Sequence, residues 1–248
     1  MNWMILPNPI SLVLDPMRLN KFLAEAGIAS RRKSDKLIQM ATTEVNGKIC
    51  LDPAYHVQVD DVVKYDGQKI KPVKEKVVVM LHKPKKVITT VRDTHGRKTV
   101  MDLVSSKHRL TPVGRLDQDT TGLLLLTNDG HLHQYLTHPK NQIAKDYEAV
   151  IKGRMTNSQI RKLSTGIYIG DKEFGNAEIL HQETDKGRST ITLRLRQGKK
   201  REIRRIMYYL KLKLFSLKRI RFGGLSLGNL PESGQRNLTK EEIKSLQE

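Results

Sequence analysis

One aspartate, placed between an arginine and a strongly apolar segment, is the residue in this sequence best suited to chemistry. Asp117 ends the run Gly114-Arg115-Leu116-Asp117, and four leucines, Leu123–Leu126, follow after a glycine, Gly122. Four leucines in a row, ended by an Asn128-Asp129-Gly130 turn, predict a short strand that is buried on both faces. Asp117 therefore lies next to the core, where a carboxylate is costly to desolvate unless a cation compensates it.

Arg115 is the cation nearest to Asp117 in the sequence. Taken alone, an Arg-x-Asp pair is more often a structural ion pair or a turn-capping aspartate than a reactive group, because such turns are common. The residues by themselves leave both interpretations open.

Charge indicates the kind of partner. The 248 residues carry 45 Lys and Arg against 26 Asp and Glu, a formal net charge of +19. Residues 17–72 hold ten basic and seven acidic residues, whereas residues 194–221 hold twelve basic and one acidic. A patch this dense in positive charge predicts a polyanionic partner, and the second stretch is the expected path for a chain of phosphates.

Other classes of protein fit the sequence poorly. No run approaches the roughly 18 apolar residues that span a bilayer, and residues 1–16 lack the basic start and cleavage site of a signal peptide. The single cysteine, Cys50, excludes an internal disulfide and fits a reducing cytoplasm. His131, His133 and His138 have a loop-like spacing, so we expect contact with solvent or RNA and no metal site.

The first third of the chain predicts a small unit of two helices followed by hairpins. Leu19, Phe22 and Leu23 recur at helical spacing before Gly27, and Ser30 can cap a second helix. Asn46-Gly47 and Asp66-Gly67 then predict two tight hairpins. The charged run Lys71–Lys76 suggests a domain boundary.

The rest of the chain alternates strand and helix patterns. Residues 189–196 alternate apolar and polar side chains, as a half-buried strand does, and residues 144–151 form a second apparent strand. A helix with the apolar stripe Ile203, Ile206, Met207 and Leu210 follows Gly198. Thr239 has capping-box spacing to Glu242 and predicts a short final helix.

From Met17 to the C-terminus the chain resembles the pseudouridine synthases that act on ribosomal RNA and carry an N-terminal S4 domain. Besides the segment around Asp117, the resemblance rests on several further motifs: Lys83-Pro84 with Thr89-Thr90, Asp93 with Gly96-Arg97 and Thr99-Val100, Lys145-x-Tyr147, Gly198–Arg205, Arg219-Ile220-Arg221 and Leu238-Thr239.

The resemblance implies an α+β fold with two domains. We expect an N-terminal extension over residues 1–16, an S4 RNA-binding domain over residues 17–74 and a catalytic domain over residues 75–248, with a large, mostly antiparallel sheet. Met17 matches the usual start of the family, so the preceding residues are interpreted as an extension or an upstream start.

The resemblance also implies roles for individual residues. Asp117 is expected to be the nucleophile, Arg204 the basic residue that keeps it ionised, and Tyr147 the ring that stacks on the target base. Arg115 is expected to fill the gap left by a flipped nucleotide, and Ile203 to line the pocket. Arg31, Arg32 and Lys33 in the first turn of a helix, together with Lys199, Lys200, Arg201 and Arg205, are expected to contact RNA.

Three positions depart from the family pattern. Ala41 and Thr43 stand where glycine and an aliphatic residue are expected in the S4 region, and Lys86 stands where glycine usually follows Lys83-Pro84-Lys85. If the second turn needs a positive φ, lysine is strained there, or it adds a contact with RNA.

The expected reaction isomerises a uridine of ribosomal RNA, in a stem-loop of the large subunit in preference to the small one, after the base is flipped out. It needs no cofactor or metal, and we expect a cytoplasmic monomer. The sequence leaves two alternatives: an RNA-binding ribosome assembly factor without catalysis, and a glycosidase built on Asp117 and Asp119.

Overall fold

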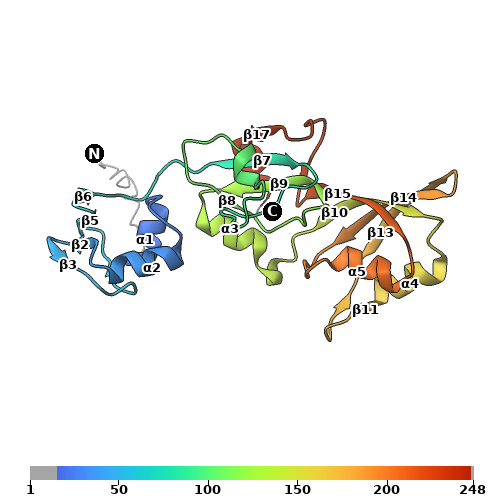
Figure 1. The fold of residues 1–248 in the computed structure, drawn as a ribbon, viewed down its shortest axis with the longest axis horizontal. Coiled ribbons are helices and arrows are strands. Elements are labelled where there is room, and N and C mark those ends of the chain that lie inside the picture. Colours follow the sequence, from blue (N-terminus) through green and yellow to red (C-terminus); the bar gives the residue numbers. More distant parts are fainter. Residues whose placement is uncertain (1–15, 247–248) are drawn as a thin grey trace, which may run out of the picture. The chain divides into compact units, whose positions relative to one another are not determined.

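The structure, a computed structural model, describes residues 16–246 (Figure 1). It divides into two compact units, Met1–Glu75 and Lys76–Glu248. Apart from Pro16, the expected N-terminal extension over residues 1–16 lies outside the described residues. Each unit has its own core, so each is described by itself.

The first unit packs two helices against short strands. Its helices are α1 (Leu19–Glu25) and α2 (Arg31–Gln39). Its strands are β1 (Met17–Arg18), β2 (Thr43–Val45), β3 (Lys48–Ile49), β4 (His56–Val57), β5 (Val63–Tyr65) and β6 (Gln68–Lys69). β1 pairs with β4, and the other four form a sheet in the order β3-β2-β5-β6. Leu19, Leu23 and Ile38 are completely buried between the helices and the sheet.

The local signals of the first unit are confirmed. Gly27 ends α1 with a φ of +83°, and the Ser30 hydroxyl accepts a hydrogen bond from the Lys33 amide at the start of α2. Asn46-Gly47 joins β2 to β3 and Asp66-Gly67 joins β5 to β6, with positive φ at all four residues. Two consecutive positive φ angles define the tight turn that suits the twist of a hairpin.

Ala41 follows α2 with a φ of +60°. The position therefore has the left-handed backbone that favours glycine, and the turn forms with alanine in its place.

The second unit is built on one large sheet with helices on its faces. Its main strands are β7 (Val78–Lys83), β8 (Thr111–Pro112), β9 (Thr121–Thr127), β10 (Lys145–Lys152), β13 (Glu178–Asp185), β14 (Arg188–Leu195), β15 (Leu214–Phe222), β16 (Leu225–Ser226) and β17 (Gln235–Asn237). A separate hairpin comprises β11 (Ile167–Tyr168) and β12 (Phe174–Gly175). The helices are α3 (Gly130–Thr137), α4 (Asn157–Thr165), α5 (Glu202–Tyr209) and α6 (Lys240–Ser245), with 3-10 turns η1 (Val100–Leu103) and η2 (Pro139–Asn141).

The strand order is β13-β14-β10-β15-β9-β7-β17, with β16 beside β15 and β8 beside β9. β9 and β15 run parallel, and the other adjacent pairs are antiparallel. The expected α+β fold with a mostly antiparallel sheet is confirmed.

The parallel contact joins the two halves of the sheet next to Asp117. Gly122 on β9 lies beside Arg219 on β15, and a Cβ atom at Gly122 would be 2.2 Å from the Arg219 carbonyl oxygen. No side chain fits there, so glycine is required for β9 and β15 to pair.

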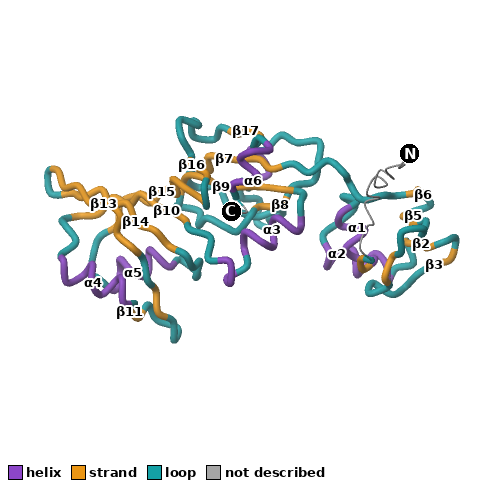
Figure 2. The backbone as a smooth tube through the Cα atoms, turned by 180° about the vertical axis from the view of Figure 1, so that it is seen from behind, coloured by secondary structure: helices purple, strands orange, loops and turns teal. Residues whose placement is uncertain are grey.

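The four leucines of β9 are buried on both faces of the sheet, as predicted. All four have no exposed area. Leu123 and Leu125 belong to the cluster that α3 and α6 cover, whereas Leu124 and Leu126 face Val100 and Leu110. A third cluster lies under α4 and α5, which share one face of the β10–β14–β13 half (Figure 1; seen from behind in Figure 2).

The segment after β9 differs from the prediction. Asn128-Asp129-Gly130 was expected to be a turn and the following histidines a loop, but Asp129 caps α3 by accepting from the amides of His131 and Leu132. Leu132 and Leu136, four residues apart, bury one face of this helix. The ring of His133 hydrogen-bonds the Pro112 carbonyl at 3.1 Å, so it serves the fold.

The remaining element predictions are confirmed. β10 and β14 coincide with the predicted strands to within a residue, and α5 buries the predicted stripe. Both hydrogen bonds of the Thr239 capping box form at the start of α6. Over residues 16–246, none of the helices has the length and hydropathy needed to cross a membrane.

Candidate active site

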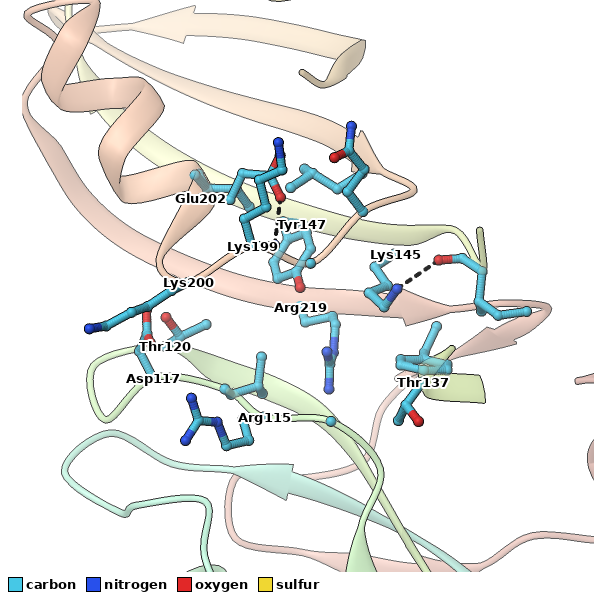
Figure 3. Close-up of a pocket in the computed structure, with 18 of the residues that line it drawn as sticks. Arg115, Asp117, Thr120, Thr137, Lys145, Tyr147, Lys199, Lys200, Glu202 and Arg219 are labelled. Atoms are coloured by element: carbon cyan, nitrogen blue, oxygen red, sulfur yellow. Dashed lines mark hydrogen bonds between the residues drawn. The ribbon is translucent and has the colours of Figure 1, made fainter. Parts of the chain in front are cut away.

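A pocket of about 530 Å³ opens where the two halves of the sheet meet (Figure 3). The loop that ends at Thr120 forms one wall, and β10, β15, the start of α5 and the end of α3 form the others. Asp117, Arg204 and Tyr147, which the sequence placed in the site, all line it.

A buried lysine holds the Asp117 loop in place. Lys83 has no exposed area, and its Nζ donates to the carbonyl oxygens of Gln118 at 3.3 Å and Thr120 at 3.0 Å. The Lys86 amide donates to the same Gln118 carbonyl at 2.9 Å. The backbone on the C-terminal side of Asp117 is therefore held by three hydrogen bonds from the Lys83–Lys86 segment.

A threonine holds the other side of the loop. The Thr89 hydroxyl donates to the Leu116 carbonyl at 2.8 Å, and the Leu116 amide lies 3.2 Å from the same hydroxyl. The Lys83-Pro84 and Thr89-Thr90 motifs thus position Asp117 from both sides. The sequence identified both motifs but gave neither a role.

Burial lowers the pKa of Lys83 to about 8, and the nearby carboxylates of Asp119 and Asp117 oppose this shift. The ammonium group is retained below that pH by its carbonyl partners, which stabilise the charged form.

Two arginines from α5 and its N-cap face Asp117. The Asp117 Oδ2 atom lies 3.7 Å from Arg204 Nε and 3.8 Å from Arg201 Nη1. These distances are too long for hydrogen bonds but within the range of an ion pair. Among the described residues these two arginines are the cations within 4 Å of the carboxylate; Arg115, which the sequence suggested, is not one of them.

Arg204 is oriented by the loop it faces. Its Nη2 donates to the Asp119 carbonyl at 3.0 Å and to the Thr120 hydroxyl at 3.2 Å, while its buried Nε has no hydrogen-bond partner in the described part of the chain. Burial and the positive charge of Arg201 lower the pKa of Arg204, although a guanidinium stays charged. The unsatisfied Nε donor lies 3.7 Å from Asp117 Oδ2.

Tyr147 stands at the centre of the pocket on β10, between Leu193 on β14 and Arg219 on β15. Its ring is partly exposed and packs against two of the hydrophobic clusters. Figure 3 shows its hydroxyl directed toward the Arg219 side chain. One face of the ring is thus supported by the core, while the pocket leaves room for a base.

Two further cations line the pocket; both stand in motifs named from the sequence, but neither was given a role in the site. Arg219 is 2% exposed; its Nε donates to the Leu123 carbonyl at 2.7 Å, and its Nη2 lacks a hydrogen-bond partner among residues 16–246. Lys145 Nζ donates to the Ile143 carbonyl at 2.8 Å. Burial, with the charge of Arg219, lowers the pKa of Lys145 to about 8. Period-two alternation from Tyr147 would have placed Lys145 on the pocket side of β10.

The structure separates the basic residues around α5 into two groups. Lys200 and Arg201 are exposed at the mouth of the pocket. Arg205, expected to contact RNA, is instead bonded to the carbonyl oxygens of Ile169 and Gly170, each at 2.6 Å, and paired with Glu173. Its guanidinium is therefore hydrogen-bonded within the protein, and its contact with RNA stays a prediction.

Lys199 is also engaged within the protein, because its Nζ donates to the Phe174 carbonyl. In the first unit, Arg31, Arg32 and Lys33 are all exposed on the first turn of α2. In the described part of the chain, no group of three or more His, Cys, Asp or Glu is arranged to hold a metal ion.

The fold and the pocket together define a class: a basic α+β protein whose pocket holds an aspartate between arginines, beside a tyrosine that can stack on a base. The chain belongs to the RNA pseudouridylate synthase family, whose model matches residues 77–209, and the S4 domain model matches residues 17–63. It is therefore an RNA pseudouridine synthase with an S4 RNA-binding domain, as the resemblance implied.

Relatives cover nearly the whole chain. The chain is similar to the ribosomal large subunit pseudouridine synthase B of Bacillus subtilis, with 38% identity over 92% of this chain and 95% of the relative. It is 32% identical to the dual-specificity RNA pseudouridine synthase RluF of Escherichia coli, over 93% of this chain and 78% of that protein. A crystal structure of a pseudouridylate synthase matches with a TM-score of 0.66 and 26% identity, over 93% of this chain and 99% of that one.

Proposed function

We propose that this enzyme converts a specific uridine of ribosomal RNA to pseudouridine, and that the uridine belongs to the large subunit. The observation that carries the proposal is the 38% identity, over nearly the full length of both chains, to a protein named as a large subunit pseudouridine synthase. The excess of basic residues in 194–221 supports a polyphosphate substrate.

The reaction breaks the C1′–N1 bond of uridine and forms a C1′–C5 bond, so atoms and charge balance once the C5 proton has moved to solvent and N1 has gained one. We assign Asp117 to attack the ribose, either by adding to C1′ or by removing a ribose proton. Arg204 and Arg201, 3.7 and 3.8 Å from the carboxylate, support this role because two cations face it from one side.

We assign Tyr147 to stack on the flipped base, because its ring stands partly exposed in the pocket and is supported from behind by the core. Arg115 is exposed at the same rim and is proposed to occupy the gap that the flipped nucleotide leaves. Ile203, which is 5% exposed and lines the pocket, is proposed as its apolar floor.

We also propose that the S4 domain extends over residues 17–74 and the catalytic domain over 75–248. Two observations beyond residue 63 support this boundary. The Ile70 side chain packs against the first unit's core, and the Val73 amide donates to the Glu25 carbonyl at 2.9 Å. A cytoplasmic monomer remains part of the proposal.

The test of the catalytic assignment is a single substitution. Asp117→Ala should abolish isomerisation while RNA affinity stays within a fewfold of wild type, because phosphate contacts supply most of the binding energy. The assay follows purified enzyme on RNA with labelled uracil and scores pseudouridine in the polymer. Wild-type turnover by the variant would contradict the role of Asp117, and release of free uracil would indicate a glycosidase.

A further inference from the structure

A second surface on the catalytic domain exposes aromatic side chains that the active site does not use. It comprises Tyr208 and Tyr209 at the end of α5 with Tyr168 and Phe174 of the β11–β12 hairpin, which we call the Tyr208 surface. Tyr208 is 77% exposed, Phe174 59%, Tyr168 48% and Tyr209 42%. A contiguous group of exposed aromatic rings is unusual on a protein that binds nothing there.

The rings form a connected chain. Tyr208 meets Tyr209 edge-to-face at 5.5 Å between centroids, Tyr209 meets Tyr168 at 6.0 Å, and Tyr168 meets Phe174 at 5.6 Å. Tyr208 ends the chain with most of its ring open to solvent, so it can accept another flat ring.

Helix α5 ties this surface to the active site. Arg204 and Tyr208 are four residues apart, which places them on one side of the helix about 6 Å apart along its axis. Arg204 lies beside Asp117, and the opposite side of the helix, with Ile203 and Ile206, is buried in the core. The Tyr208 surface therefore begins one helical turn from the residue that faces the nucleophile.

Hydrogen bonds and close packing attach the hairpin to α5. The Arg205 guanidinium binds the Ile169 and Gly170 carbonyls. A Cβ at Gly175 would lie only 3.1 Å from Ile206, which shows how closely β12 approaches the helix. The hydrogen bonds of Arg205 thus attach the hairpin that carries Tyr168 and Phe174 to the helix that carries Tyr208 and Tyr209.

Two lysines lie beside the Tyr208 end of the surface. An open hollow of about 460 Å³ is lined by Tyr208, Tyr209 and Leu212 together with two exposed lysines, Lys211 and Lys213. The acidic residues nearby, Asp171 and Glu173, are paired with Arg205. Aromatic faces between lysines fit a polyanion that carries flat rings.

Lys211 stands at a position that favours glycine. Its φ is +56°, and the Leu212 amide donates to the Met207 carbonyl at 2.8 Å, which is the hydrogen bond that closes a helix with a left-handed residue. A lysine there is strained relative to glycine. A lysine at this strained position is accounted for if its positive charge contributes to binding a ligand.

We infer that the Tyr208 surface binds an unpaired nucleotide of the RNA substrate, with the base stacked on Tyr208 and the backbone phosphates beside Lys211 and Lys213. The inference rests on the proposed function, since it assumes an RNA substrate whose uridine enters the neighbouring pocket. Every base has a face that an aromatic ring can cover, so this contact selects an unpaired nucleotide at a fixed distance from the target, whatever its identity.

The test measures equilibrium binding of the full-length protein to a short RNA stem-loop with single-stranded flanks. Tyr208→Ala should weaken binding about 10-fold, the lower part of the range for loss of one stacked base. Tyr208→Phe should bind like wild type because the ring remains, and Tyr208→Leu should bind like the alanine variant because it is apolar but not aromatic. The side chain is 77% exposed, so all three variants should keep the wild-type thermal unfolding temperature.

An abasic nucleotide placed in turn at each unpaired position locates the contact. At one position the loss from the abasic nucleotide and the loss from Tyr208→Ala should not add, because both remove the same stack. Lys211→Gly should raise the unfolding temperature while weakening binding and its salt dependence.

Two results would overturn the inference. Additive losses at every position, or unchanged affinity in Tyr208→Ala, would show that no base stacks there. A change in sedimentation with unchanged RNA affinity would show a contact between copies of the chain. The binding measurement does not depend on turnover. Failure to find pseudouridine would therefore contradict the proposed function, but it would not decide whether a base stacks on Tyr208.

Discussion

At the scale of single residues, the charged side chains of the site differ in how many partners they have for their charges and hydrogen-bonding atoms. Asp117 is attracted by two arginines without being hydrogen-bonded to either, so its oxygens remain available to a substrate. Lys83 is buried but has carbonyl partners on the Asp117 loop, whereas Arg219 is buried with one nitrogen unsatisfied in the described residues. An unsatisfied buried donor is costly, and a substrate oxygen can satisfy it.

The partly buried Lys145 makes the unfolding free energy of the protein depend on pH in a measurable way. Its folded-state pKa, about 8, lies below the ordinary 10.5, so between these values the unfolded chain binds a proton that the folded chain does not. Stability from this group therefore increases as pH rises from about 8 to 10.5, and Lys83 acts in the same direction. Lys145→Met should remove the contribution of Lys145 to this increase. Between pH 7 and 10 the unfolding free energy of the variant should therefore rise by roughly 1–3 kcal/mol less than that of wild type.

Urea unfolding of wild type and Lys145→Met at the two pH values checks this expectation. The variant should also be more stable than wild type at pH 7, because no charge is buried. An equal gain with pH in both proteins would mean that Lys145 titrates normally.

The presence of Asp117 and Arg204 in one pocket could be predicted from the sequence because both stand in motifs that the family resemblance covers. The pairing of Asp117 with Arg201 could not, because a loop of unknown path precedes α5. The partners of Arg205 could not be predicted for a related reason: Ile169 and Gly170 are on a hairpin more than 30 residues away.

At the scale of elements, a local sequence pattern predicted the element correctly where the residues were typical of only one kind of structure. The alternation in β14, the stripe of α5 and the capping box of α6 all appear as expected. The α3 helix was missed because Asn128-Asp129-Gly130 is also a turn signal, and only the spacing of Leu132 and Leu136 distinguishes the two.

The turn at Lys86 shows a sequence departure that the fold tolerates. Its φ is +64°, the left-handed backbone that costs a non-glycine residue about 1 kcal/mol. Lys86→Gly should therefore raise the unfolding free energy by about 1 kcal/mol. The neighbouring Lys85→Gly is the matched control, because Lys85 is also exposed but has no positive φ, and it should be neutral or slightly destabilising.

Chemical denaturation of the two variants distinguishes these outcomes. Equal effects would show that the turn is not strained at Lys86. If Lys86→Gly also loses RNA affinity, the lysine is retained for its interaction with a phosphate.

At the scale of the whole molecule, two compact units divide the work. The first unit has little net charge, +3 over residues 17–72, so its RNA contacts must be local. The catalytic domain concentrates a net +11 in residues 194–221, which run from β14 through α5 to β15, past the pocket. The order of the domains and the class of the sheet could be inferred from the sequence, whereas the parallel β9–β15 contact that creates the pocket could not, because it depends on pairing across nearly 100 residues.

The first unit should contribute to binding through the start of α2. Replacing Arg31 and Arg32 together with glutamine should weaken RNA binding and lower the slope of log K against log salt by about one for each phosphate that the protein no longer neutralises. Lys48 is an exposed cation on β3 and provides the comparison. Lys48→Gln should have a smaller effect on RNA binding and on its salt dependence. An unchanged slope in the double variant would count against docking of RNA on α2.

The most direct test of the proposed function is a map of pseudouridine in both ribosomal RNAs, by chemical labelling and primer extension, from cells with and without this protein. We expect that one site in large-subunit RNA is lost, and that wild type restores it but Asp117→Ala does not. An unchanged map would contradict the ribosomal substrate, and restoration by Asp117→Ala would contradict the mechanism.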